Sequence, residues 1–175
     1  MVNITLPDGS TKSFENPPTG EDVARSISEG LARECVAAEV DGKMIDLYRE
    51  IPEDASVRLV TTRDPEGLEI MRHTAAHVMA QAILRVYPDA KLTIGPVVED
   101  GFYYDIDMAP VSEEAFAGIE AEMKRIVKEK LPIQRQEVQK SEALEMYRDE
   151  PYKLEMINDL QDGTISIYRQ GDFAD

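Results

Sequence analysis

Short segments of alternating apolar and polar residues in the first third of the chain predict β-strands. Turn-forming residues separate these segments: Pro7-Asp8-Gly9-Ser10 joins the first two, and Asp41-Gly42, a dipeptide typical of two-residue hairpins, joins the third and fourth. Between the two pairs, Thr19 and Asp22 predict the N-terminus of a helix that ends near Gly30. The strands are predicted at residues 2–6, 11–14, 36–40, 43–47 and 57–61.

Two longer helical segments dominate the rest of the chain. The first is predicted from Leu68 to Tyr87 and ends because Pro88 follows. The second is predicted from Ser112, its N-cap, to Leu131, with acidic residues in its first turn and basic residues in its last turns, an order that suits the helix dipole. Further strands are predicted at residues 91–98, 102–107, 133–138 and 164–169, and a short helix from Ser141.

The order of these elements predicts an α+β fold with two domains. A hairpin, a helix and further strands within the first 62 residues are the pattern of a β-grasp, ubiquitin-like domain. Residues 62–67 are polar, contain one proline and one glycine, and are typical of a linker. We therefore expect a β-grasp domain at residues 1–62 and a second α+β domain at residues 63–175.

Composition narrows the functional classes. The net charge is −16, from 19 basic and 35 acidic residues. This argues against nucleic-acid binding that depends on an overall positive charge. The single cysteine, Cys35, excludes an intramolecular disulfide and indicates the reducing cytoplasm; we expect it to pack as a small hydrophobic residue. No apolar run approaches the ~18 residues that span a bilayer, so no membrane partner is expected.

The only two histidines of the chain, His73 and His77, share one face of the first long helix because they are four residues apart. They form either a structural pair or titratable groups for acid–base work or for positioning water. The segment lacks the adjacent glutamate of the zinc-protease motif, so it does not indicate that mechanism. We expect both imidazoles to face a groove, with the helix against a sheet made of residues 91–98 and 102–107. The opposite face, predicted to be buried, carries Met71, Ala75, Met79 and Val86.

Five sequence motifs stand out along the chain. They are Leu6-Pro7-Asp8-Gly9-Ser10, His73-Thr74-Ala75-Ala76-His77, the segment Ile94-Gly95-Pro96-Val97-Val98-Glu99-Asp100-Gly101-Phe102-Tyr103-Tyr104-Asp105, Pro151-Tyr152-Lys153 and Gly171-Asp172-Phe173-Ala174-Asp175. In this order they resemble the N-terminal region of bacterial-type threonyl-tRNA synthetases, which holds a TGS domain of β-grasp fold and then an α+β editing domain shared with alanyl-tRNA synthetases. The resemblance covers essentially the whole chain.

The resemblance implies an enzyme that attaches threonine to its tRNA with ATP, and a role for this region in hydrolysing serine wrongly attached to that tRNA. It implies that His73 and His77 activate or position water and contact the terminal ribose. It implies that Lys153 lies near a phosphate or near the negative charge that develops during the reaction. It also implies that Asp175 binds the amino group of the substrate or orients another side chain. These four are the expected catalytic residues. Tyr104 is the expected substrate-binding residue at the pocket wall.

The resemblance also implies partners and cofactors. The expected partner is the tRNA for threonine, mischarged with serine at its 3′ end; the parent enzyme is expected to be a homodimer and this fragment a monomer. ATP, Mg and Zn are implied for other domains of the parent, and no cofactor or metal for this fragment. In the family a Cys-x-x-x-His pair follows the aspartate that matches Asp175, so the chain looks cut there and is expected to be weakly active or inactive alone.

Two alternatives stay open. The chain could be a non-catalytic module with a TGS domain, in which both units only bind tRNA or a protein partner. It could also act on mischarged tRNA of the alanyl type, although alanyl editing domains do not normally follow a TGS-like unit.

Overall fold

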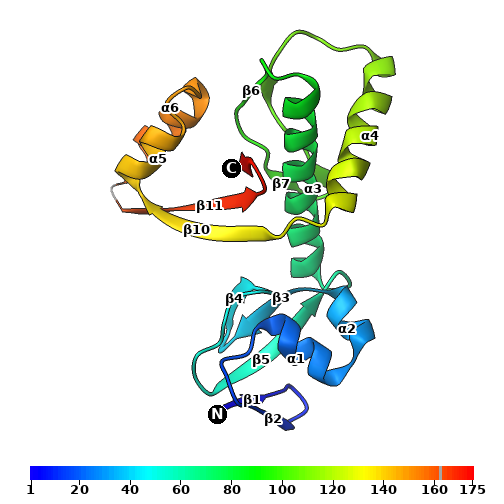
Figure 1. Ribbon diagram of the computed structural model, residues 1–175, viewed down its shortest axis with the longest axis vertical. Coiled ribbons are helices and arrows are strands. Elements are labelled where there is room, and N and C mark those ends of the chain that lie inside the picture. The colour runs from blue at the N-terminus through cyan, green and yellow to red at the C-terminus, as the bar shows by residue number, and fades with distance from the viewer. Residues whose placement is uncertain (162) are drawn as a thin grey trace. The chain divides into compact units, whose positions relative to one another are not determined.

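The computed structural model describes residues 1–161 and 163–175 (Figure 1). The chain forms two compact units, Met1–Met71 and Arg72–Asp175, and the division falls inside the long helix α3. Among the described residues, no helix is both long enough and apolar enough to cross a membrane.

The first unit is a five-stranded sheet in the order β2-β1-β5-β3-β4. The β1–β5 pair is parallel and the other pairs are antiparallel, which with the helix between the two hairpins is the predicted β-grasp arrangement. Its elements are β1 (Val2–Thr5), β2 (Thr11–Phe14), α1 (Gly20–Ile27), α2 (Glu29–Glu34), β3 (Cys35–Val40), β4 (Lys43–Asp46) and β5 (Ala55–Thr61).

Local sequence signals account for the boundaries of these elements. The Asp41-Gly42 turn has positive φ at both residues, 47° and 80°, as a type I′ hairpin requires. Thr19 and Asp22 form the predicted capping box of α1, since each side chain accepts a hydrogen bond from the other's backbone N–H. The helix ends at Ile27, where Ser28 caps a separate helix α2 that the pattern did not predict.

The core of the first unit lies between the sheet and α1. Ile4 of β1, Val23 of α1 and Val57 of β5 are fully or almost fully buried in it. Glycine at position 20 lets α1 pack closely on the sheet, because a Cβ there would lie 2.9 Å from the Cβ of Ala38 in β3. Cys35 is a buried free thiol in an apolar cluster, which confirms its predicted packing role.

In its described residues, the second unit combines the rest of α3 with a hairpin, three further helices and a three-stranded sheet. In Figure 1, α5 and α6 lie on one side of the β10–β11 ribbon, and the C-terminus turns back beside it. The elements are α3 (Pro65–Val86), β6 (Lys91–Leu92), β7 (Val97–Val98), β8 (Gly101–Phe102), β9 (Ile106–Asp107), α4 (Glu113–Glu129), β10 (Ile133–Gln139), α5 (Lys140–Met146), α6 (Pro151–Asp159), β11 (Thr164–Gln170) and β12 (Phe173–Ala174).

Helix α3 begins earlier than predicted, inside the expected linker. Pro65 is its first residue, a position where the missing N–H of proline costs nothing. Asp64, just before it, accepts hydrogen bonds from the backbone N–H and the hydroxyl of Thr61 at 2.7 and 3.0 Å. The chain therefore passes from β5 to α3 through a tight turn, and only part of residues 62–67 is non-helical.

The predicted buried face of α3 is wrong in part. Met71 and Val86 are exposed, at 43% and 39%, whereas Ala76 and Ala80 are fully buried. The reason is that the helix is covered on two sides, so no single apolar stripe describes it. One side packs on α4, and the buried residues of that cluster are Val78, Ala82, Ile83, Ala90, Ile119 and Ile126. The other side contacts the β6–β9 hairpin and β12, and the buried residues of that cluster are Ala80, Leu92 and Phe173.

The predicted strands 91–98 and 102–107 form one antiparallel hairpin with two short ladders, β6–β9 and β7–β8. Between the ladders, the chain stays paired through single backbone bonds, such as Asp105 N to Ile94 O at 2.9 Å. The guanidinium of Arg72 donates to the carbonyl of Glu99 at 2.7 Å and ties α3 to the turn of this hairpin.

The three-stranded sheet has the order β10-β11-β12. Strands β10 and β11 confirm the two strands predicted there, while β12 and α6 were not predicted. Gly171 and Asp172 form a two-residue turn from β11 to β12, with φ of +59° at Gly171. This turn brings the last residues back alongside β11, where Asp175 and Tyr168 exchange two backbone hydrogen bonds of 2.8 and 2.9 Å.

Candidate functional site

The five predicted site residues come together in the second unit, around the carboxylate of Asp175. The hydroxyl of Tyr104 donates to Oδ2 of Asp175 at 2.8 Å, and Nε2 of His77 lies 3.5 Å from the same oxygen. Lys153 Nζ forms an ion pair with the other oxygen, Oδ1. His73 joins through the ring of His77, with centroids 4.6 Å apart and the rings nearly perpendicular at 84°.

Four separate elements supply these side chains. Helix α3 presents His73 and His77 on successive turns, and the hairpin after it carries Tyr104 between β8 and β9. Lys153 lies in the first turn of α6, and Asp175 directly follows β12. The site therefore depends on the tertiary structure of the second unit.

The two histidines differ in exposure. His73 is exposed, whereas the side chain of His77 is only 13% exposed. The ring of His77 lies 6.2 Å from that of Tyr168 and 6.0 Å from that of Phe173, measured between centroids. Its neighbours thus include two further aromatic rings and a carboxylate. That both imidazoles face a groove stays a prediction.

Burial decides the protonation of His77. Loss of hydration lowers the pKa of this imidazole below its usual 6.5, and the neighbouring His73 imidazole and Lys153 ammonium act in the same direction. The carboxylate of Asp175 raises the pKa but does not outweigh burial. His77 is therefore a neutral imidazole at pH 7, able to accept a proton or a hydrogen bond.

The tyrosine hydroxyls of the site stay protonated. Burial, then the charge of Asp175 and the hydrogen bond to it, raises the pKa of Tyr104 far above its usual 10. Burial and the same carboxylate raise the pKa of Tyr147 to about 12. Among the described residues the buried Tyr147 hydroxyl has no hydrogen-bond partner. Tyr104 thus acts as a hydrogen-bond donor at any physiological pH.

Lys153 is a cation that is largely shielded from water. Its side chain is 12% exposed and that of Asp175 is 11% exposed, so the ion pair is shielded from bulk water. Its ammonium also lies 3.4 Å from the Tyr104 hydroxyl. A cation, a carboxylate and a phenol held together in this way can bind a charged ligand group or stabilise charge that develops during a reaction.

The sequence pattern missed the aromatic residues around the histidines and the reason why Asp175 reaches them. Tyr168 and Asp175 are cross-strand neighbours, and Tyr168 also lies 6.3 Å from the ring of His73. Gly171-Asp172 is a two-residue hairpin signal, and it would have predicted this return of the chain. For Tyr147, no signal in the sequence indicated a place near the site.

The metal-binding capacity of the described chain is limited. Within residues 1–161 and 163–175, no three His, Cys, Asp or Glu side chains are grouped so that they could hold a metal ion. The side chains of the Asp175 cluster offer a neutral imidazole, a largely shielded cation, a carboxylate and phenol donors.

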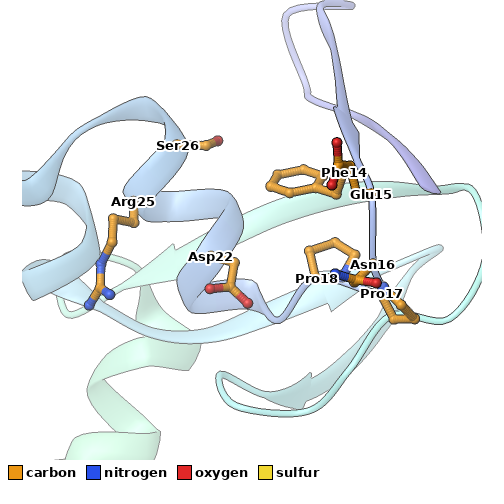
Figure 2. Close-up of a pocket in the computed structure, with 8 residues that line it drawn as sticks. All are labelled: Phe14, Glu15, Asn16, Pro17, Pro18, Asp22, Arg25 and Ser26. Atoms are coloured by element: carbon orange, nitrogen blue, oxygen red, sulfur yellow. The ribbon is translucent and has the colours of Figure 1, made fainter. Parts of the chain in front are cut away.

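The first unit has a separate open hollow (Figure 2). Phe14 and the two prolines Pro17 and Pro18 form its apolar wall. Two of its charged side chains already have partners: Asp22 accepts from Thr19, and Arg25 pairs with Glu21 at 2.8 Å. The other lining residues are Glu15, Asn16 and Ser26. The hollow brings together no group comparable to the Asp175 cluster.

Known proteins resemble both units. The family model described as the TGS domain matches residues 2–61. The threonine–tRNA ligase of Desulfosudis oleivorans is 66% identical over 175 residues, and that of Desulforapulum autotrophicum is 65% identical, each match covering all of this chain. The whole chain is thus related to threonine–tRNA ligases. The more distant enzyme of Rubrobacter xylanophilus is 48% identical over 176 residues, again covering the whole chain.

These relatives are much longer proteins. The chain spans 28% of the length of each threonine–tRNA ligase named above. The resemblance seen in the sequence is confirmed, and so is a TGS domain of β-grasp fold in an α+β chain. The five residues around Asp175 lie outside the TGS match, and their roles stay predictions.

Proposed function

We propose that the chain is the TGS-plus-editing region of a threonine–tRNA ligase, and that its second unit hydrolyses serine wrongly attached to the tRNA for threonine. The observation that carries this proposal is the convergence of His77, Tyr104 and Lys153 on the carboxylate of Asp175, with His73 against the ring of His77. The relatives' name, threonine–tRNA ligase, supports the identity of the tRNA.

The need for such a site follows from binding energetics. A synthetase site for threonine can reject valine, which lacks the hydroxyl, but serine is only one methyl smaller. A difference of one such group is worth about 1–3 kcal/mol, or about 10–200-fold in selectivity. A second pocket that is too tight for the methyl of threonine, but that admits serine, supplies the missing discrimination.

In the proposed reaction, water adds to the carbonyl carbon of the seryl ester. The neutral imidazole of His77 takes a proton from this water, while His73, which is exposed, contacts the terminal ribose or holds the water. The bond between the carbonyl carbon and the ribose oxygen then breaks, the proton passes to that oxygen, and serine and tRNA leave.

The remaining residues bind charge in this scheme. The ammonium of Lys153 stabilises the negative charge that develops on the carbonyl oxygen. The carboxylate of Asp175 binds the amino group of serine, and its bonds to Lys153 and Tyr104 hold it in place. The Tyr104 hydroxyl, protonated at all physiological pH values, lies at the pocket wall and donates.

The rest of the longer enzyme supplies the other functions. A net charge of −16 gives this chain little help in holding RNA phosphates, so we expect other domains to bind the tRNA. The ATP-dependent attachment of threonine, its ATP, Mg and Zn, and dimerisation also belong to those domains in our proposal. We expect the enzyme to act in the cytoplasm.

The test is release of serine from pre-charged seryl-tRNA for threonine by the full-length enzyme, at fixed low salt. His73→Ala and His77→Ala should each lower the rate by about 10²-fold or more if the imidazoles act as base or hold the water. Glu145→Ala, at an exposed ion pair of α5, is the control and should leave the rate unchanged. If the double histidine variant released serine at the parent rate, the proposal would be wrong.

Residues 1–175 alone should release serine poorly or not at all, because the family's Cys-x-x-x-His pair is expected after Asp175. When catalytic groups act together, losing some of them costs nearly as much rate as losing all of them.

A non-catalytic binding module is the second candidate. It predicts that the full-length enzyme also fails to release serine while residues 1–175 still bind the tRNA. Release of the wrong amino acid from mischarged tRNA of the alanyl type would support the third alternative.

A further inference from the structure

Gly95 lies directly across the hairpin from Tyr104. The neighbours on each side are paired through the backbone: Asp105 N donates to Ile94 O at 2.9 Å, and Tyr103 N donates to Pro96 O at 3.3 Å. Gly95 and Tyr104 are therefore opposite one another in the gap between the β6–β9 and β7–β8 ladders. Facing residues of an antiparallel pair bring their side chains closest together.

The ring of Tyr104 occupies the space that a side chain at position 95 would need. A Cβ built on Gly95 would lie 2.2 Å from Cδ2, 2.5 Å from Cε2 and 2.9 Å from Cγ of Tyr104, its three nearest atoms. The backbone itself does not demand glycine, because the φ of Gly95 is outside the positive range that Gly9, Gly42 and Gly171 adopt. An aromatic ring that covers a cross-strand glycine is a known stabilising arrangement in sheets.

Tyr104 also packs against the buried cluster formed by Ala80 of α3, Leu92 of β6 and Phe173 of β12. A methyl group on residue 95 would therefore push the ring into packed side chains or swing it out of the site. Either movement would separate the Tyr104 hydroxyl from Asp175, to which it now donates at 2.8 Å.

We propose that Gly95 is a positioning residue of the editing site: its missing side chain lets the Tyr104 ring lie over position 95, and this sets where the hydroxyl meets Asp175 and Lys153. The role in catalysis rests on the proposed function. The steric coupling between the two positions does not, and it can be measured in this chain without any substrate.

The first experiment is a double-mutant cycle on thermal unfolding of residues 1–175. Gly95→Ala should lower the midpoint by roughly 4 °C or more. The same substitution should cause less than half that shift in a Tyr104→Ala background, where the ring is absent; Tyr104→Val is the alternative background. Gly101→Ala is the matched control, since it lies in β8 of the same hairpin with open space around its Cβ. Equal shifts with and without the ring would overturn the steric coupling.

The second experiment separates the ring from its hydroxyl in the full-length enzyme. In a Tyr104→Phe background, Gly95→Ala should still lower the thermal midpoint, because the ring remains. It should cause no further loss of serine release, because the hydroxyl that it misplaces is already gone. In the parent background it should lower serine release about as much as Tyr104→Phe does.

The outcomes are distinguishable. A further loss of serine release on adding Gly95→Ala to Tyr104→Phe would overturn the positioning role. If the parent enzyme released no serine at all, the proposed function would fail, while the unfolding cycle would still decide whether Gly95 positions the Tyr104 ring.

Discussion

At the scale of single residues, the carboxylate of Asp175 is the common partner of an imidazole, a phenol and an ammonium group. All of these groups are largely shielded from water, so each one changes the protonation and stability of the others. Two consequences can be measured on the chain itself.

The first concerns pH. Because burial lowers the pKa of His77 in the folded state, the unfolded chain binds this proton more tightly than the folded chain does. The free energy of unfolding should therefore fall as the pH drops through 6.5 towards the lowered folded pKa, and be regained above 6.5. Urea unfolding at pH 5.5 and 7.5 measures this difference. It should shrink in His77→Gln but persist in His73→Gln, and an unchanged difference in His77→Gln would contradict the assignment.

The second concerns Lys153. Lys153→Met leaves the carboxylate of Asp175 buried without its cation, and removing one partner of a buried pair costs about 3–5 kcal/mol. Glu145→Ala breaks the exposed Arg148–Glu145 pair and should cost about 0.5 kcal/mol or less. Urea unfolding of both variants compares the two pairs. Equal, small losses would mean that the Lys153–Asp175 pair is not shielded from water.

At the scale of elements, local signals predicted most helices and strands. Capping residues, turn dipeptides and prolines act on neighbours in sequence, so α1, α3, α4, the β3–β4 hairpin and the β10 and β11 strands could be predicted. The burial of α3 could not, because it depends on α4 and β12 covering two sides of one helix. The return strand β12 was missed because its two residues are too short for a periodic pattern.

The turn that returns the chain gives a prediction of its own. Gly171 has φ of +59°, and a Cβ there would also lie 2.8 Å from Cδ1 of Leu131. Gly171→Ala should therefore cost about 1–3 kcal/mol of the free energy of unfolding. Gly118→Ala, in the exposed part of α4 with nothing near its Cβ, should instead gain about 0.5–1 kcal/mol. Chemical denaturation compares the two, and a neutral Gly171→Ala would contradict the turn geometry.

At the scale of the whole molecule, the chain divides between Met71 and Arg72, nine residues beyond the predicted domain end at 62. The first turns of α3 contact β5: Arg58 pairs with Glu66 at 3.3 Å, and Gly67 lies so close to the carbonyl of Thr61 that a Cβ would be 1.8 Å from it. Residues 63–71 therefore contribute to the fold of the first unit.

Two fragments test this boundary. We expect residues 1–62 to unfold cooperatively, and residues 1–71 to do so at a higher midpoint because they keep the contacts of Asp64, Glu66 and Gly67. Thermal unfolding followed by circular dichroism measures both. Equal midpoints would mean that the start of α3 adds nothing to the first unit.

Only part of the candidate site could be predicted from the sequence. Spacing alone indicated only the His73/His77 pair, because both histidines lie on one helix. Tyr104, Lys153 and Asp175 came from family resemblance, since they lie on other elements and no local pattern relates them. The contacts of Tyr168 and the close approach of Gly95 to Tyr104 depend on strand pairing, and they became visible only in the structure.

The most direct measurement uses the fact that the chain has only two histidines, so every imidazole signal in its NMR spectrum reports on the proposed site. Residues 1–175 are titrated with adenosine that carries serine as a stable amide in place of the 3′ ester, with the threonine amide and free adenosine as controls. The imidazole signals of His73 and His77 should shift and saturate with the serine compound, and shift less with either control. Imidazole signals that stay unmoved at millimolar serine amide, or that respond equally to all three compounds, would contradict a seryl-ester site at these residues.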